Sequence, residues 1–222
     1  MALARIPDDL SVIVLTYNRP QVVAMVAALP AGLEVIVTDD GTLPSLARQL
    51  PAHVQYVRHD HDGNRASTCR NAGAQRATRP KLLFLDDDVV PHPLCFATHS
   101  LALEMYAASL GLLVQKRWHP YTDDRMLFYV HEEQVLWNWC WSGNLAVRRS
   151  AFEAVGGFDG ATFDGGAGFE DIDLGRRLWL AKQPLHLNRL ALAHHPSPHT
   201  AENPPPAVLR NQARYQAKWG EA

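Results

Sequence analysis

The sequence has 222 residues, 47% hydrophobic and 20% charged, so it has enough apolar material for one compact core and does not resemble a disordered chain. A net charge of -2 excludes nucleic-acid-binding proteins that rely on bulk positive charge. The three cysteines, Cys69, Cys95 and Cys140, are far apart and form no C-x-x-C pair. A disulfide framework is therefore not expected, and a reducing, cytoplasmic location is favoured.

The amino terminus carries Asp8 and Asp9 where a signal peptide needs an apolar segment. No uninterrupted apolar stretch approaches the roughly 20 residues that span a bilayer. We therefore expect no transmembrane segment, although the protein could still contact a membrane surface peripherally.

The first half alternates between short apolar runs, typical of buried strands, and segments typical of helices. Residues 12–15 form the first run, and Pro20 favours the start of a helix that ends near Leu29. The alternation continues with strands predicted at 34–38, 54–57 and 81–85 and a helix at 64–78. This order predicts an α/β fold whose mostly parallel sheet is flanked by helices.

The second half is less regular. Helices are predicted at 92–108, 150–156, 170–181 and near the carboxyl terminus, and strands at 111–115, 144–148 and 185–193. Trp137, Trp139 and Trp141 alternate with other residues, so on a strand they would share one face. They could stack on a sugar or belong to the core.

Polar clusters follow three of the predicted strands. Because ligands bind outside the carboxyl ends of strands in such sheets, we expect the clusters to converge on one crevice. The clusters are Thr16, Tyr17 and Asn18, then Asp39 and Asp40, and finally Asp86, Asp87 and Asp88.

The three consecutive aspartates are costly unless a cation or hydrogen-bond donors offset their repulsion. Carboxylate oxygens favour Mg²⁺, Mn²⁺ or Ca²⁺, and such an ion beside a diphosphate would stabilise a departing nucleotide. A solvated acidic turn is the alternative. His194 and His195 follow the last predicted strand, and an imidazole ligand would favour Mn²⁺, although a lone histidine is more often structural.

The turn at 39–42, Asp-Asp-Gly-Thr, permits several interpretations. Its carboxylates could accept hydrogen bonds from a base or ribose, or simply close an aspartate-rich turn. It also resembles the Asp-x-Asp-Gly-Thr signature of haloacid-dehalogenase-type phosphatases. However, Thr38 occupies the position of the nucleophile and cannot form an aspartyl phosphate.

Charged residues mark the start of two predicted helices. Arg65 and Arg70 lie near the start of the helix at 64–78, where they could meet phosphate oxygens or simply be exposed. Glu170 and Asp171 open a helix after a glycine-rich loop at 164–168. An ionised carboxylate there could act as general base on an acceptor hydroxyl, or simply stabilise the helix terminus.

Together these motifs resemble the family 2 glycosyltransferases of the GT-A fold, and the second half resembles the galactosyltransferase and polypeptide N-acetylgalactosaminyltransferase group. The matching motifs keep the family's order, at 11–19, 35–42, 69–73, 83–88, 142–152, 156–159 and 168–178. The resemblance implies one domain over 1–222. Its parts are a nucleotide-binding half at about 10–110, a donor-sugar and acceptor half at 111–200, and a tail and helix at 201–222.

The resemblance also implies roles. Asp171 would be the catalytic base of inverting members, and Glu170 would bind acceptor or sugar. Asp86 and Asp88 would be the outer residues of the Asp-x-Asp motif and would bind Mn²⁺ (or Mg²⁺) together with His194 or His195, with Asp88 as the direct ligand. The other implied donor contacts, to the nucleotide, diphosphate or sugar, are Thr16, Tyr17, Asn18, Asp39, Asp40, Arg65, Asp87, Gly143 and Asn144.

The implied reaction moves a sugar from a nucleotide-sugar, most often a UDP-sugar, to a glycan, lipid-linked or small-molecule acceptor. Related enzymes with a similar second half retain configuration, so a retaining enzyme stays an alternative to an inverting one. A non-catalytic sugar-nucleotide or glycan-binding module is another. A nucleotidyltransferase would need a glycine-rich, basic loop at 16–20, where the sequence is Thr-Tyr-Asn-Arg-Pro.

Overall fold

The computed structural model describes residues 5–60, 64–114, 137–195 and 205–220. The strands are β1 (Leu10–Thr16), β2 (Glu34–Asp39), β3 (Gln55–Arg58), β4 (Lys81–Asp86), β5 (Val90–Pro91), β6 (Ala108–Val114), β7 (Asn144–Arg148) and β8 (Leu185–His194). The helices are α1 (Val22–Ala27), α2 (Ala66–Arg76), α3 (Cys95–Met105), α5 (Arg149–Ala154), α6 (Gly160–Phe163), α7 (Glu170–Leu180) and α8 (Pro206–Trp219).

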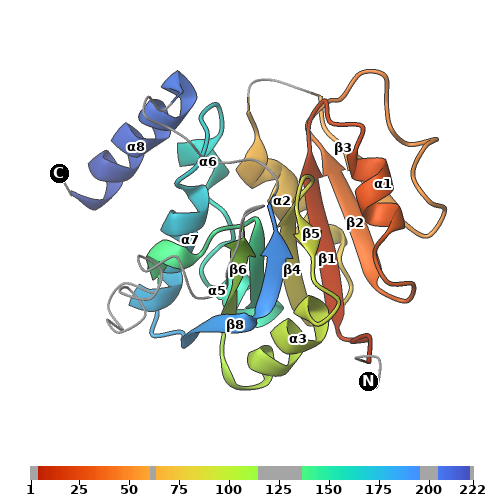
Figure 1. The fold of residues 1–222 in the computed structure, drawn as a ribbon. Helices are drawn as coiled ribbons and strands as arrows, with labels where there is room; N and C mark the ends of the chain where they lie inside the picture. Colours follow the sequence, from red (N-terminus) through yellow and green to blue (C-terminus); the bar gives the residue numbers. More distant parts are fainter. Residues whose placement is uncertain (1–4, 61–63, 115–136, 196–204, 221–222) are drawn as a thin grey trace.

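The strands form one eight-stranded sheet in the order β3-β2-β1-β4-β7-β6-β8-β5 (Figure 1). β1 pairs in parallel with β2 and β4, and β2 pairs in parallel with β3. β7 runs antiparallel between β4 and β6, whereas β6 and β8 are parallel. The predicted α/β fold is confirmed, with a sheet that becomes mixed in the second half.

Hydrophobic side chains on the two faces of the sheet form separate cores. Val12 and Val14 pack with the apolar residues of α1 and α3, whereas Ile13 packs with those of α2, α5 and α7. This alternation follows from the pleat of a strand, because successive side chains point to opposite faces. Both faces of the parallel strands are therefore covered by helices, as expected from their continuous apolar runs.

One boundary predicted for the second half was wrong, and the sequence leaves the conformation of the tryptophan segment open. The helix predicted to reach Ala108 ends at Met105, because Tyr106 adopts extended backbone and Ala108 already belongs to β6. The tryptophan segment is not a strand: residues 137–139 form a 3₁₀ turn. The rings of Trp139 and Trp141 consequently lie 5.0 Å apart at 44°, rather than along one strand face.

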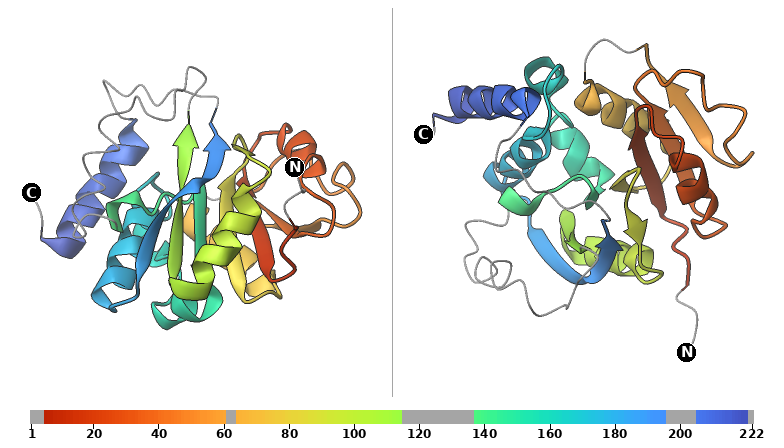
Figure 2. Two further views of the ribbon diagram at one scale, coloured as in Figure 1. Left: turned by 60° about the horizontal axis from the view of Figure 1, so that its bottom comes forward. Right: turned by 45° about the horizontal axis from the view of Figure 1, so that its top comes forward.

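Helix α8 lies beside α6 and α7, on the side of the molecule away from β1, β2 and β3 (Figure 2).

Within the described ranges, no helix combines the length and the apolar character needed to cross a bilayer.

Candidate active site

The carboxyl ends of β1, β2 and β4 meet at one edge of the sheet, as predicted. Thr16 pairs with Asp39 across the β1–β2 register, and Leu15 pairs with Asp86 across the β1–β4 register. The hydroxyl of Thr16 donates to Asp87 Oδ2 at 2.6 Å. The backbone N–H of Asp40 donates to the carbonyl of Thr16 at 3.0 Å. The three polar clusters thus share one wall.

Asp39 and Asp40 have different surroundings. Asp39 Oδ1 accepts from the N–H and hydroxyl of Thr42 at 2.8 and 2.6 Å, and Oδ2 accepts from the hydroxyl of Tyr56. These contacts use both oxygens to close the turn and to tie it to β3. Asp40 Oδ2 accepts from the backbone N–H of Arg65 at 3.1 Å, just before α2.

The loop after β1 lies against the same turn. Asn18 has a left-handed backbone with φ of 52°, and its N–H donates to the hydroxyl of Thr42 at 2.8 Å. Tyr17 is 41% exposed, so its ring is accessible to a ligand at this edge. Arg65 was predicted to contact phosphate. In the structure its Nη1 atom donates to the carbonyl of Asp60, after β3, at 3.1 Å.

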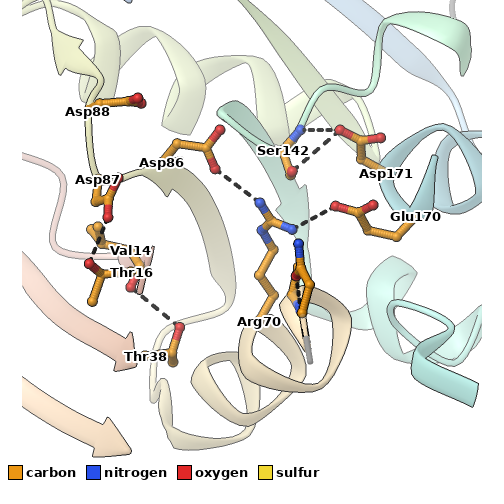
Figure 3. A network of polar contacts seen from close by, with 12 residues as sticks. Val14, Thr16, Thr38, Arg70, Asp86, Asp87, Asp88, Ser142, Glu170 and Asp171 are labelled. Atoms are coloured by element: carbon orange, nitrogen blue, oxygen red, sulfur yellow. Dashed lines mark hydrogen bonds and ion pairs between the residues drawn. The ribbon is translucent and has the colours of Figure 1, made fainter. Parts of the chain in front are cut away.

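The aspartate run divides into three differently placed carboxylates (Figure 3). Asp86 Oδ1 accepts from Arg70, whereas Asp87 is buried against Thr16 and Arg19. Burial raises the pKa of Asp87 to about 6, opposed by the hydrogen bond from Thr16 and the charge of Arg19. Asp88 Oδ2 accepts a hydrogen bond from the guanidinium of Arg19, and the carboxylate points away from Arg70.

Arg70 connects the aspartate run to the second half of the chain. Its Nη2 donates to Asp86 Oδ1 at 3.0 Å and its Nη1 donates to Glu170 Oε1 at 2.9 Å (Figure 3). Arg70 and Glu170 are buried, so their ion pair is shielded from solvent, whereas Asp86 is partly exposed. Sequence reasoning missed the link to Glu170, because the two residues are 100 positions apart and no local pattern joins them.

Glu170 and Asp171 occupy the first turn of α7. The N–H of Ser142 donates to Asp171 Oδ2 at 3.1 Å, and the N–H of Ile172 donates to Oδ1 at 2.8 Å. Burial, followed by the charge of Asp171, raises the pKa of Glu170 to about 7. Burial likewise raises the pKa of Asp171, against its backbone hydrogen bonds. Both carboxyl groups are therefore stronger bases than exposed ones.

Gly143 and Asn144 lie at the start of β7, between the aspartate run and the first turn of α7. A Cβ on Gly143 would lie 2.9 Å from Asp86 Oδ2, so glycine permits the close approach of β7 to the aspartate run. The side-chain amide of Asn144 donates to the carbonyls of Ala191 at 2.8 Å and Leu112 at 3.3 Å. The amide of Asn144 on β7 therefore joins β6 and β8. Its oxygen lies 3.1 Å from Nε2 of His99 on α3.

The four residues predicted to bind metal are not equivalent. His195 Nε2 lies 3.4 Å from Asp88 Oδ1, and both side chains are largely buried. His194 is paired with Val90 in the β5–β8 ladder, and Asp86 is bound to Arg70. Among the described residues, no group of three or more His, Cys, Asp or Glu side chains is arranged to hold a metal ion.

One carboxylate and one imidazole nevertheless fit a divalent cation whose other ligands come from a diphosphate and water, because Mg²⁺ and Mn²⁺ at phosphate sites take few protein ligands. Asp88 and His195 are the pair that fits.

The chain is similar to known proteins in sequence and in fold. The family model described as glycosyl transferase family 2 matches residues 11–156, and that of the N-terminal domain of galactosyltransferase matches residues 129–196. Validoxylamine A glucosyltransferase of Streptomyces hygroscopicus subsp. limoneus is 28% identical over an alignment of 229 residues, with 81% of this chain and 50% of the relative covered. Hyaluronan synthase of Pasteurella multocida is 35% identical over 107 residues, 43% of this chain and 11% of the synthase.

Solved structures show the same fold. GalNAc-T7 with UDP, GalNAc and Mn²⁺ superposes with a TM-score of 0.69 at 14% identity, over 95% of this chain and 48% of that one. Mannosyltransferase PcManGT from Pyrobaculum calidifontis, in complex with GDP-Man and Mn²⁺, gives 0.64 at 16% identity, over 94% and 69%. The fold is that of the GT-A glycosyltransferases, as predicted.

The chain spans about half the length of the validoxylamine A glucosyltransferase that it matches. Its second half shares the galactosyltransferase-like region expected from the motifs at 142–178. Since the family model covers residues 11–156, well over half of the 222 residues, the chain belongs to glycosyl transferase family 2.

Proposed function

We propose that this chain is a metal-dependent glycosyltransferase that moves a sugar from a UDP-sugar to an acceptor hydroxyl with inversion at the anomeric carbon. The observation that carries the proposal is the placement of Asp171. It is a partly buried carboxylate, held by the backbone of Ser142, across Arg70 from the aspartate run at the end of β4.

The proposed reaction is a single displacement. The acceptor oxygen forms a bond to the anomeric carbon as the bond from that carbon to the diphosphate oxygen breaks. The hydroxyl proton passes to the carboxylate of Asp171, and the bonding electrons leave with the nucleoside diphosphate. The N–H groups of Ser142 and Ile172 fix the carboxylate in place, so little reorientation is needed during transfer.

Arg70 would set the separation between the donor and acceptor sides. Its guanidinium holds Asp86 on the donor side and Glu170 beside Asp171. Glu170 would then contact the acceptor or the transferred sugar. Asp88 and His195 would hold a divalent cation, and the imidazole ligand favours Mn²⁺ over Mg²⁺. The bound cation would neutralise charge on the leaving diphosphate.

The names of relatives and neighbours support the donor class. Validoxylamine A glucosyltransferase suggests transfer of a sugar to a small molecule, and chondroitin synthase of Escherichia coli suggests a glycan acceptor. Three solved neighbours are complexes: GalNAc-T7 holds UDP, GalNAc and Mn²⁺, TarS of S. aureus holds UDP-GlcNAc, and PcManGT holds GDP-Man and Mn²⁺. Two of these three carry uridine, which is why we propose a UDP-sugar.

Thermal denaturation with UDP-, GDP- and dTDP-sugars tests the proposal. A ligand that binds only the native state raises the melting temperature. We expect the largest rise in melting temperature with a UDP-sugar and Mn²⁺. In a separate assay, adding acceptor should release UDP, and excess chelator should stop this release. Undiminished transfer in chelator would contradict the metal requirement, and a product of retained anomeric configuration would contradict inversion.

A further inference from the structure

Helix α8 lies outside the residues matched by either family model, which end at 156 and 196. It nevertheless packs against the glycine-rich loop at 164–168 that precedes Glu170 and Asp171 (Figures 1 and 2). The catalytic pair proposed above therefore depends on a loop whose outer side is covered by a distant part of the chain.

Asn211 is the central contact between α8 and this loop. The side chain is 1% exposed, and its Nδ2 donates to the carbonyls of Phe163 at 3.0 Å and Gly168 at 2.9 Å. Phe163 directly precedes the loop and Gly168 is its last residue, so one amide holds both ends. A Cβ on Gly166 would lie 2.0 Å from Asn211 Oδ1, so the loop can approach the amide only without a side chain there.

Two further hydrogen bonds join α8 to the same segment. The N–H of Ala167 donates to the carbonyl of Ala207 at 3.0 Å. The guanidinium of Arg214 donates to the carbonyl of Asp164 at 3.0 Å and to Asn211 Oδ1 at 2.9 Å, which fixes the orientation of the asparagine amide. The loop is thus held at its start, centre and end.

The residue just before the catalytic pair is strained. Phe169 has a left-handed backbone with φ of 71°, a conformation that a residue other than glycine keeps only where its surroundings impose it. Its ring lies 5.6 Å from that of Tyr215 on α8. The helix therefore contacts both the loop and the strained residue that sets the direction in which α7 begins.

The far end of α8 is attached to the first turn of α7. Asp173 Oδ1 accepts from Trp219 Nε1 at 3.0 Å and from Lys218 Nζ at 2.7 Å. The Asp173 side chain is fully buried, so these contacts are shielded from water. The two places that α8 contacts, the loop at 164–168 and Asp173, lie on either side of Glu170 and Asp171 in the sequence.

We propose that α8 positions the Glu170–Asp171 pair, and that Asn211 is the principal positioning residue, acting through the loop at 164–168. This inference rests on the proposed function for its effect on catalysis. The nucleotide-binding turn and the aspartate run lie on β1, β2 and β4 and make their own contacts. Loss of Asn211 should therefore lower turnover while nucleotide affinity is kept.

The test compares Asn211→Leu with Arg210→Leu, which changes the neighbouring, exposed residue of the same helix. Hydrogen exchange should become faster over residues 164–172 in the first variant and not in the second. Turnover should fall on the order of tenfold to a hundredfold in Asn211→Leu, because small displacements of catalytic groups have effects of that size. Affinity for UDP, measured calorimetrically, should change less than about twofold (within ~0.4 kcal/mol).

Unchanged exchange over 164–172 in Asn211→Leu would overturn the positioning role, as would a loss of turnover matched by an equal loss of UDP affinity. If Asn211→Leu does not fold, Asn211→Asp gives the same decision, because it keeps the acceptor for Arg214 and loses both donated bonds. If the wild-type protein transfers no sugar, the proposed function is contradicted. Faster exchange over residues 164–172 in Asn211→Leu would then still support the role of α8 in holding the loop.

Discussion

The guanidinium of Arg70 donates to the carboxylate of Glu170 at 2.9 Å, although the two residues stand 100 positions apart. The same guanidinium donates to Asp86 at 3.0 Å. One buried cation thus joins the end of β4 to the first turn of α7 (Figure 3). The two halves of the chain contribute one wall each to the candidate site, and Arg70 links them.

Replacing Arg70 should be strongly destabilising. Arg70→Met leaves Glu170 buried without its counter-charge, and breaking a buried pair on one side costs about 3–5 kcal/mol of unfolding free energy. The matched control is Arg76→Met on the exposed part of the same helix, expected within about 0.5 kcal/mol of wild type. Urea denaturation measures both.

The double variant Arg70→Met with Glu170→Gln should recover part of that loss, because the uncompensated charge is removed. Equal stability of Arg70→Met and Arg76→Met would mean that the ion pair contributes little.

Glu170 should make stability depend on pH. Burial, and then the charge of Asp171, raises its pKa from 4.5 to about 7 in the folded protein. The folded state then binds this proton more tightly than the unfolded chain, so the group contributes stability below pH 4.5 that is lost as pH rises through 7. Glu170→Gln should lack this decline when unfolding free energies are measured across that range. Parallel curves for variant and wild type would refute the raised pKa.

Adjacent histidines provide a matched test of the cation site. His195 lies 3.4 Å from Asp88, whereas His194 lies in the β5–β8 ladder beside Val90. His195→Ala should weaken Mn²⁺ binding to the UDP-loaded protein roughly ten- to hundredfold, a range typical of altered metal sites. His194→Ala should leave it nearly unchanged. Equal losses in titration calorimetry would remove the distinction between them.

Gly73 should resist a substitution that normally favours helices. Alanine in place of glycine stabilises an unpacked helix by roughly 0.5–1 kcal/mol. Here a Cβ would lie 2.5 Å from Ile13 Cγ2 and 2.9 Å from Thr38 Cγ2, so α2 would be pushed off the sheet. Gly73→Ala should therefore lower the unfolding free energy by about 1–3 kcal/mol. An increase in melting temperature would show that the sheet accommodates the methyl group.

Much of the fold was predictable because the first half consists of continuous apolar runs with polar ends. Residues 12–15 and 81–85 lie within β1 and β4, and the clusters that follow them meet as expected. The boundary near Ala108 was not predictable, since apolar residues there suit a helix or a strand equally. The conformation of the tryptophan segment stayed open because alternation alone does not distinguish a strand from a turn.

The site was predictable in its components and less so in its connections. The order of motifs pointed to Asp86, Asp88 and Asp171. The pairing of Arg70 with Glu170 and the choice between His194 and His195 depend on packing between distant elements. The role of Asn211 is likewise invisible in the sequence, because a lone asparagine on a terminal helix carries no local signal.

The rate of sugar transfer by Asp171→Asn, compared with Asp8→Asn at an exposed position, tests the central claim most directly. We predict that transfer falls by roughly 10²–10⁴-fold, as expected for loss of a general base, while UDP affinity in Mn²⁺ stays close to wild type. Transfer at the wild-type rate by Asp171→Asn would contradict the assignment of Asp171 as the catalytic base.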